Sequence, residues 1–199
     1  METNKVKVVV ADPTTLGLFG LAIVTLVASS QKLGITEGAG LLVPWAMLLG
    51  GMGQLIASMF DFKHNNLFGA TAFAAYGLFW MGMAWGWMTS AGVFGTTLAA
   101  STDPRQLGFV FAGYAVISLV LTISTVKMSK VMFVLMSLIV LLFVSLAFSS
   151  FCGGHFWHNA AAYVELAISL VTFYALAAKY LSGFFGRDML PVGKPLCRS

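Results

Sequence analysis

Among the side chains inside long apolar stretches of the sequence, Gln54, Tyr76 and Glu165 stand out because they can hydrogen-bond or ionise. Polar groups at membrane depth are costly unless they are paired or line a wet cavity, so they are the first candidates for function. Tyr76 lies roughly 14 Å along its apolar stretch if that stretch is helical. A hydroxyl in apolar surroundings is what a narrow hydrophobic constriction with one hydrogen-bonding group requires.

Two leucines occupy comparable depths in other apolar stretches. Leu21 and Leu138 each lie roughly 10 Å from the same side as Tyr76, at a helical rise per residue. The three side chains could therefore meet at one level and form such a constriction. Depth alone leaves this meeting open, because the sequence does not fix the rotation of each helix.

Glu165 lies roughly 9 Å inside the other end of its apolar stretch. Three interpretations remain open for this acid. It accepts a hydrogen bond within a helix bundle, it lies against an outer vestibule, or it takes part in proton coupling. The structural interpretations are favoured, because a carboxyl group this near an interface can reach water.

The first apolar run begins with "ADPTTLGLFG", in which an acid and a proline stand at the mouth of the run. Asp12 as N-cap with Pro13 at the first helical position is a competent helix start. The free N–H groups of the same helix end could also receive a carboxylate. An ionised Asp12 would repel that anion, so it must cap the helix, be screened by a cation or carry a proton. We favour capping.

The stretch "FCGGHFWHN" spaces Cys152, His155 and His158 at three-residue steps. This spacing is a weak metal signal, because a complete site needs a fourth ligand and a fixed fold. We therefore predict no metal site. The sequence has no Ser-His-Asp set, no pair of carboxylates suited to hydrolysis and no motif for haem, Fe–S or flavin. It predicts a protein that is not an enzyme and that needs no cofactor.

The elements that position these side chains follow from composition. The 199 residues are 59% hydrophobic and 9% charged, with a mean hydropathy of +0.90, which predicts an integral membrane protein. A spanning helix needs roughly 20 apolar residues. We predict one all-α domain over residues 1–199, with a short segment 1–13, a tail 182–199 and six transmembrane helices near 14–31, 41–60, 67–89, 107–126, 131–150 and 159–181.

Basic residues predict the orientation. With six spans both termini share a side, and most of the 11 Lys and Arg residues fall on that side. They are Lys5, Lys7, Lys63, Lys127, Lys130, Lys179, Arg187, Lys194 and Arg198, against Lys32 and Arg105 on the other. Positively charged residues favour the cytoplasm, so we expect both termini to be cytoplasmic. The basic residues form no continuous stripe, so the sequence does not indicate nucleic-acid binding.

The beginning of the sequence, "METNKVKVVVADP", lacks the apolar core and cleavage site of a removable signal peptide. We expect the first helix itself to direct insertion into the cell membrane. Cys152 and Cys197 fall on opposite sides of the membrane in this topology, so we expect that they do not pair within a chain.

Three ordered motifs resemble the acetate uptake transporter family, which includes the succinate–acetate permeases. "DPTTLGLFG" resembles the family's N-P-x-P-L-G-L signature, with Asp12, Pro13 and Gly17 at pattern positions. "FGRDMLPVG" resembles its F-G-R-x-x-L-P-x-G ending. Residues 50–80 resemble its longest shared block, and the matching positions are Gly50, Gly51, Gln54, Ala57, Asn66, Phe68, Gly69, Thr71, Ala72, Phe73, Tyr76, Gly77, Phe79 and Trp80.

The resemblance implies a homo-hexamer in the membrane in which each protomer carries acetate or a similar small monocarboxylate. It also implies a constriction formed by an aromatic residue, a tyrosine and a leucine, at the positions of Leu21, Tyr76 and Leu138. The fold is said to resemble that of urea and amide channels, so a urea or short-amide channel is the alternative function.

The chain departs from the family pattern at five informative positions, one of which is Thr15 in place of the signature's second proline. Asp12 replaces an Asn, Leu21 replaces the aromatic residue of the constriction, Asp61 replaces a Glu, and Glu165 stands where a small residue is usual. A leucine at the constriction suggests a looser gate that admits a longer acid.

The expected mechanism is passage of a small carboxylic acid guided by hydrogen bonds. Gln54 and Asn66 would act at the mouths, with Tyr76 and Trp80 inside. Asp12 and Glu165 are the candidates for proton-linked groups. The choice between a channel and a proton-coupled transporter stays open, as does transport of succinate.

Overall fold

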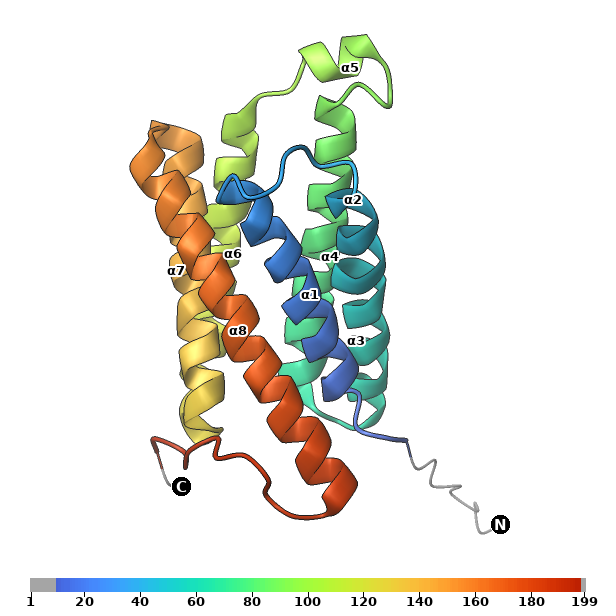
Figure 1. Cartoon of the computed structure of the whole chain (residues 1–199), viewed down its shortest axis with the longest axis vertical. Coiled ribbons are helices and arrows are strands. Elements are labelled where there is room, and N and C mark those ends of the chain that lie inside the picture. The colour runs from blue at the N-terminus through green and yellow to red at the C-terminus, as the bar shows by residue number, and fades with distance from the viewer. Residues whose placement is uncertain (1–9, 198–199) are drawn as a thin grey trace, which may run out of the picture.

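In the computed structural model, which describes residues 10–197, six helices long and apolar enough to cross a membrane stand side by side (Figure 1). The spans are α1 (Thr14–Lys32), Leu42–Lys63, α4 (Leu67–Ser90), Pro104–Lys127, α7 (Lys130–Cys152) and α8 (His155–Phe185). No strand occurs within the described residues. The prediction of an all-α bundle with six spans is confirmed.

Polar side chains define where several helices begin. The Asn66 side chain accepts from the Gly69 N–H at the start of α4, at 3.3 Å. Ser129 accepts from the Met132 N–H at the start of α7, at 3.2 Å. These bonds satisfy N–H groups that have no partner inside the helix.

The second span, Leu42–Lys63, is composed of three elements: α2 (Leu42–Trp45), the π-helical segment η1 (Ala46–Gly53) and α3 (Gln54–Lys63). Its glycines allow close packing, because a Cβ at Gly50 would lie 2.9 Å from Trp80 Cγ, and one at Gly51 would collide with Met81. Small residues thus allow close helix packing in this span, and its π-helical geometry was not predicted.

The remaining elements are α5 (Thr96–Ala100), a short helix in the connection after α4, α6 (Pro104–Ser124) and η2 (Thr125–Lys127). The helix α1 packs on α8 and on the second span, and α7 lies between α6 and α8. Two buried hydroxyls tie neighbouring helices together: Ser169 donates to the Ala22 carbonyl at 2.8 Å and Ser58 to the Ala70 carbonyl at 2.7 Å.

The C-terminal tail, residues 186–197, returns along the end of the bundle (Figure 1). The Tyr174 hydroxyl donates to the Pro191 carbonyl at 2.8 Å, and the Val131 N–H donates to the Val192 carbonyl at 3.1 Å. The tail is therefore pinned to α7 and α8 and forms part of the surface at this end.

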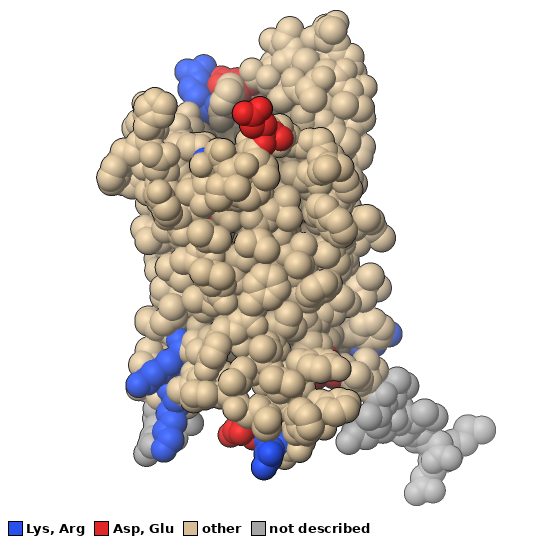
Figure 2. All heavy atoms as spheres, viewed as in Figure 1, with Lys and Arg blue, Asp and Glu red and all other residues tan. Residues whose placement is uncertain are grey.

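Charged side chains gather at the two ends of the bundle, and the face in Figure 2 is uncharged between them. Lys32 and Arg105 lie at the end opposite the termini. The described basic residues at the end of the termini are Lys63, Lys127, Lys130, Lys179, Arg187 and Lys194. Lys5, Lys7 and Arg198, and most of the predicted segment 1–13, lie outside the described residues. The cytoplasmic orientation stays a prediction.

Candidate functional site

A cavity of about 790 Å³ opens at the end of the bundle that holds the termini. We call it the vestibule. It lies between α1, α4, α7, α8 and the tail, and its walls become apolar with depth. The residues used below that line it are Asp12, Thr14, Thr15, Leu21, Asn66, Tyr76, Ile139, Lys179, Ser182 and Asp188.

The vestibule ends at Leu21, Tyr76 and Ile139, which also line a second cavity of only about 20 Å³. Because the same three side chains face both spaces, they separate one from the other. All three are buried, with exposed fractions of 7%, 4% and 4%. We call this set the constriction.

Leu138, which the resemblance placed at the constriction, lines neither cavity. It is partly buried against the core, and its neighbour Ile139 lines both cavities instead. Successive residues of an α-helix point about 100° apart, so one position in the sequence decides which side chain faces inward. The structure brings Leu21 and Tyr76 together, with Ile139 as their third member.

The Tyr76 side chain is held on two sides. Its hydroxyl and the Ser118 hydroxyl of α6 form a hydrogen bond of 2.9 Å, and Ser118 is fully buried. Its ring stacks on Phe143, with centroids 6.2 Å apart. The phenol is therefore held in place where it lines both cavities. Ser118 was not singled out from the sequence. Like Gln54, it is a polar residue inside an apolar run, and that property could have identified it.

The small cavity beyond the constriction has an apolar surface, although Thr25 and Trp80 are among the residues that line it. The Thr25 hydroxyl donates to the Leu21 carbonyl at 2.7 Å. Trp80, predicted to act inside the pathway, does line this space and is 3% exposed. Thr25 was also missed; its position one helical turn after Leu21 could have indicated the same face.

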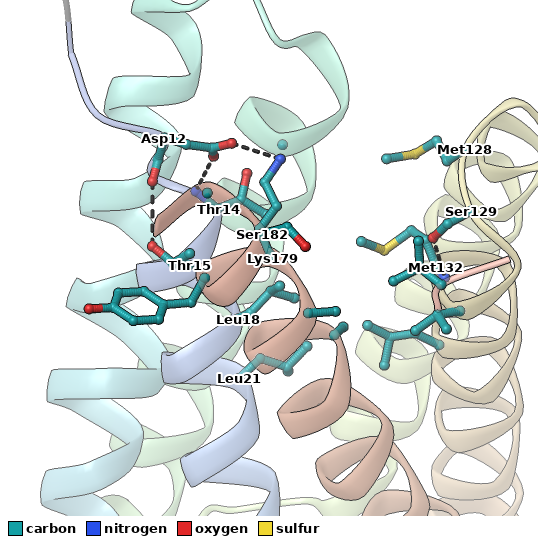
Figure 3. Close-up of a pocket in the computed structure, with 18 of the residues that line it drawn as sticks. Asp12, Thr14, Thr15, Leu18, Leu21, Met128, Ser129, Met132, Lys179 and Ser182 are labelled. Atoms are coloured by element: carbon teal, nitrogen blue, oxygen red, sulfur yellow. Dashed lines mark hydrogen bonds and ion pairs between the residues drawn. The ribbon is translucent and has the colours of Figure 1, made fainter. Parts of the chain in front are cut away.

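The rim of the vestibule holds an ion pair between α8 and the start of α1 (Figure 3). Lys179 Nζ lies 2.7 Å from Asp12 Oδ2, and the Thr14 N–H donates to Asp12 Oδ1 at 3.0 Å. Partial burial raises the pKa of Asp12, but the bonds from Lys179 and Thr14 outweigh it and hold this pKa below its usual value. Asp12 thus accepts a hydrogen bond from the first N–H of α1 and is screened by a cation.

Pro13 and Gly17 shape the same helix start. Pro13 immediately precedes α1 with helical dihedrals of −77° and −12°, and its carbonyl accepts from the Leu16 N–H at 3.0 Å. The helix therefore begins at Thr14, as in the predicted span 14–31, and Pro13 occupies the N-cap position that was predicted for Asp12. A Cβ at Gly17 would collide with the ring of Phe73, so the glycine allows α4 to approach α1 beside the vestibule.

Asn66 lines the vestibule, and its amide is already engaged. Asn66 Nδ2 donates to Asp61 Oδ1 at 2.8 Å, while its oxygen accepts from Gly69. Asp61 is 1% exposed, and its Oδ2 has no hydrogen-bond partner among the described residues. The acid therefore orients the amide, leaving one Nδ2 hydrogen available to the cavity.

Gln54, the other residue expected at a mouth, lies away from both cavities. Its side chain is fully buried and its Nε2 donates to the Gly50 carbonyl at 2.9 Å. A Cβ at Gly20 would lie 3.4 Å from Gln54 Cγ, which shows that the side chain packs against α1. This position suits a role in holding η1 against α1.

Glu165 forms an ion pair with Lys32 at the end of the bundle opposite the termini. The Lys32 Nζ donates to Glu165 Oε2 at 2.8 Å, and the exposed fractions of the two side chains are 15% and 1%. His158 lies beside them, with Nε2 3.2 Å from the Lys32 carbonyl oxygen. This arrangement agrees with the first of the three interpretations, a hydrogen bond within the bundle; proton coupling stays a prediction.

The stretch with metal-ligand spacing lies at the same end. Within residues 10–197, no three or more His, Cys, Asp or Glu side chains are close enough together to hold a metal ion. Cys152 ends α7, whereas the Cys197 N–H donates to the Val126 carbonyl at the opposite end. The two thiols are free and lie at opposite ends of the bundle, as the topology predicted.

Known proteins resemble this chain over almost its whole length. A model of the GPR1/FUN34/yaaH family matches residues 2–185. The succinate-acetate/proton symporter SatP of Escherichia coli K12 is 30% identical over 186 residues, which cover 92% of this chain and 96% of that protein. Accumulation of dyads protein 2 of Saccharomyces cerevisiae is 30% identical over 168 residues, covering 82% of this chain and 59% of that protein.

A solved structure, described as that of the bacterial acetate channel SatP, matches the fold with a TM-score of 0.86. The match covers 93% of this chain and 100% of that one, at 25% identity. Sequence motifs, a family model and a three-dimensional match therefore agree. The chain belongs to the GPR1/FUN34/yaaH family, and it is a multi-pass membrane protein.

Proposed function

We propose that this protein carries acetate and similar small monocarboxylates across the membrane through a pathway inside one protomer. The observation that carries the proposal is the vestibule that ends at Leu21, Tyr76 and Ile139. It lies within a fold that matches the structure described as an acetate channel. In this proposal the chain is a transport protein and not an enzyme.

The chemistry of the constriction favours passage of the neutral acid. A carboxylic acid with a pKa near 4 is almost all anion at pH 7. A bare charge is expensive in apolar surroundings, and the small cavity is lined mainly by side chains such as Leu142, Phe143 and Ile168. The Tyr76 hydroxyl, shared with Ser118, is the hydrogen-bonding group at this level. The acid would therefore cross the constriction protonated or together with a proton.

Two further features belong to the proposal. The vestibule faces the cytoplasm, because the described Lys and Arg residues gather at its end of the bundle. The protein assembles as a homo-hexamer, which the family resemblance implies. The exposed large apolar side chains along the spans suit contact with lipid or with other copies.

The test is uptake of labelled acetate by proteoliposomes, with and without a proton gradient, in competition with propionate, succinate and urea. Accumulation above equilibrium that follows the gradient would establish proton-coupled transport. Uptake that only equilibrates would establish a channel. Urea flux without acetate flux would overturn the substrate assignment.

The same assay tests the pathway. Tyr76→Phe removes the hydroxyl at the constriction and should reduce acetate flux while the protein still assembles. Tyr163→Phe is the matched control, because Tyr163 is 65% exposed on α8 and lines neither cavity. Unchanged flux in Tyr76→Phe would remove the hydroxyl from the pathway.

A further inference from the structure

The vestibule of this chain carries one basic side chain at its rim. Among the described residues that line it, Lys179 is positively charged and no other is a lysine or an arginine. Two acids, Asp12 and Asp188, line the same space. An anion that enters the vestibule therefore meets one cation, the Lys179 ammonium. The carboxylates of Asp12 and Asp188 compete with the anion for it.

The Lys179 ammonium is held in place by Asp12, which stands just before α1. Asp12 Oδ2 holds it at 2.7 Å, and Asp12 is itself fixed by the bond from the Thr14 N–H to Oδ1. Both side chains of the pair are 48% exposed. An ammonium group has three donors, and Asp12 takes one of them, so donors remain for a second oxygen.

Neutral polar groups surround the same point. Thr15 and Ser182 line the vestibule next to the ion pair, one from each of the two helices that meet there (Figure 3). The Ser182 hydroxyl accepts from the Met189 N–H at 3.3 Å, which leaves its own proton free to donate. A small carboxylate beside Lys179 could thus accept hydrogen bonds from the ammonium and from the Ser182 hydroxyl, both at the rim of the vestibule.

We propose that Lys179 docks the carboxylate of the transported acid at the rim of the vestibule, and that Asp12 weakens this docking by competing for the same ammonium. The inference rests on the proposed function and adds to it the residue that recognises the charged form of the substrate. Recognition of the anion at Lys179 precedes the apolar constriction, where the neutral form passes.

This proposal predicts opposite effects for the two members of one ion pair. Lys179→Gln removes the docking charge, so it should raise the half-saturating acetate concentration by about twofold to fivefold, the range of an exposed ion pair. Asp12→Asn frees the ammonium and should lower that concentration by a similar factor. Asn is as good a helix cap as Asp, so the start of α1 is kept.

The measurement is equilibrium exchange of labelled acetate in proteoliposomes, in which both faces meet the same concentration and the orientation of the protein does not matter. Lys127→Gln is the matched control, because it removes an exposed basic residue at the same end that does not line the vestibule. We expect it to leave the half-saturating concentration unchanged. Lys179→Arg should retain most of the affinity of the wild type.

The outcomes separate the inference from the proposed function. If the wild type exchanges acetate and Lys179→Gln binds it as well as the wild type does, the docking role is wrong and the proposed function stands. If Asp12→Asn and Lys179→Gln are impaired alike, the pair is only structural and the inference is overturned. No acetate exchange by the folded wild type would overturn the proposed function itself.

Discussion

The ion pair between Lys32 and Glu165 allows a prediction about stability that depends on which partner is removed. The two side chains join the end of α1 to α8, and they differ in burial: Lys32 is 15% exposed and Glu165 is 1% exposed. We compare Lys32→Met, which leaves the carboxylate without its cation, with Glu165→Gln, which leaves the ammonium without its anion.

The difference in burial sets the magnitudes. Removing one partner of a buried ion pair costs about 3–5 kcal/mol, because the other charge stays buried without compensation. We expect about 3 kcal/mol for Lys32→Met. In Glu165→Gln the lysine can extend toward water and the amide oxygen still accepts its hydrogen bond, so we expect about 1 kcal/mol. At the scale of a soluble domain of this length, these costs correspond to about 6–12 °C and about 2–4 °C in Tm.

Thermal unfolding of the purified protein in detergent, at neutral pH, measures the difference. The double variant Lys32→Met with Glu165→Leu replaces both charges by apolar groups and should be more stable than Lys32→Met alone. A loss of Tm in Glu165→Gln as large as in Lys32→Met would refute the argument from burial. A loss of Tm in the double variant equal to the sum of the losses in Lys32→Met and Glu165→Gln would also refute this argument.

Three further predictions concern the end with the vestibule. Gly17→Ala places a methyl group into an aromatic ring of α4 and should cost about 1–3 kcal/mol in thermal unfolding, whereas Gly82→Ala, which meets nothing within 4 Å, should be neutral or slightly stabilising. The lowered pKa of Asp12 means that its ion pair stabilises the protein above the unfolded pKa of about 3.9 and that this contribution is lost as the pH falls through the lower folded value. The wild type should therefore lose more Tm than Asp12→Asn on acidification below about pH 4, and an equal loss would speak against this linkage. Ile139→Ala should raise the uptake of butyrate relative to acetate, since its side chain narrows the proposed pathway, while Leu138→Ala should leave this ratio unchanged; the reverse result would place Leu138 in the pathway.

Parts of the candidate site could be predicted from the sequence because they are local. Asp12 accepts a bond from a backbone N–H two residues away, and such caps depend on neighbouring residues alone. Tyr76 and Trp80 stand out because polar groups are rare at membrane depth, and both line the small cavity beyond the vestibule. Gln54 stands out for the same reason, yet it is buried against η1, because rarity does not say which way a side chain points.

The sequence by itself determined the six spans, the family and the end at which basic residues gather. These depend on the length of apolar runs, on ordered motifs and on charge, all of which are properties of the chain in one dimension. Only the tertiary structure decided that Ile139 and not Leu138 meets Leu21 and Tyr76, and that Lys179 pairs with Asp12. The rotation of a helix about its axis and the contact between α1 and α8 result from packing along the whole bundle, which no local pattern encodes.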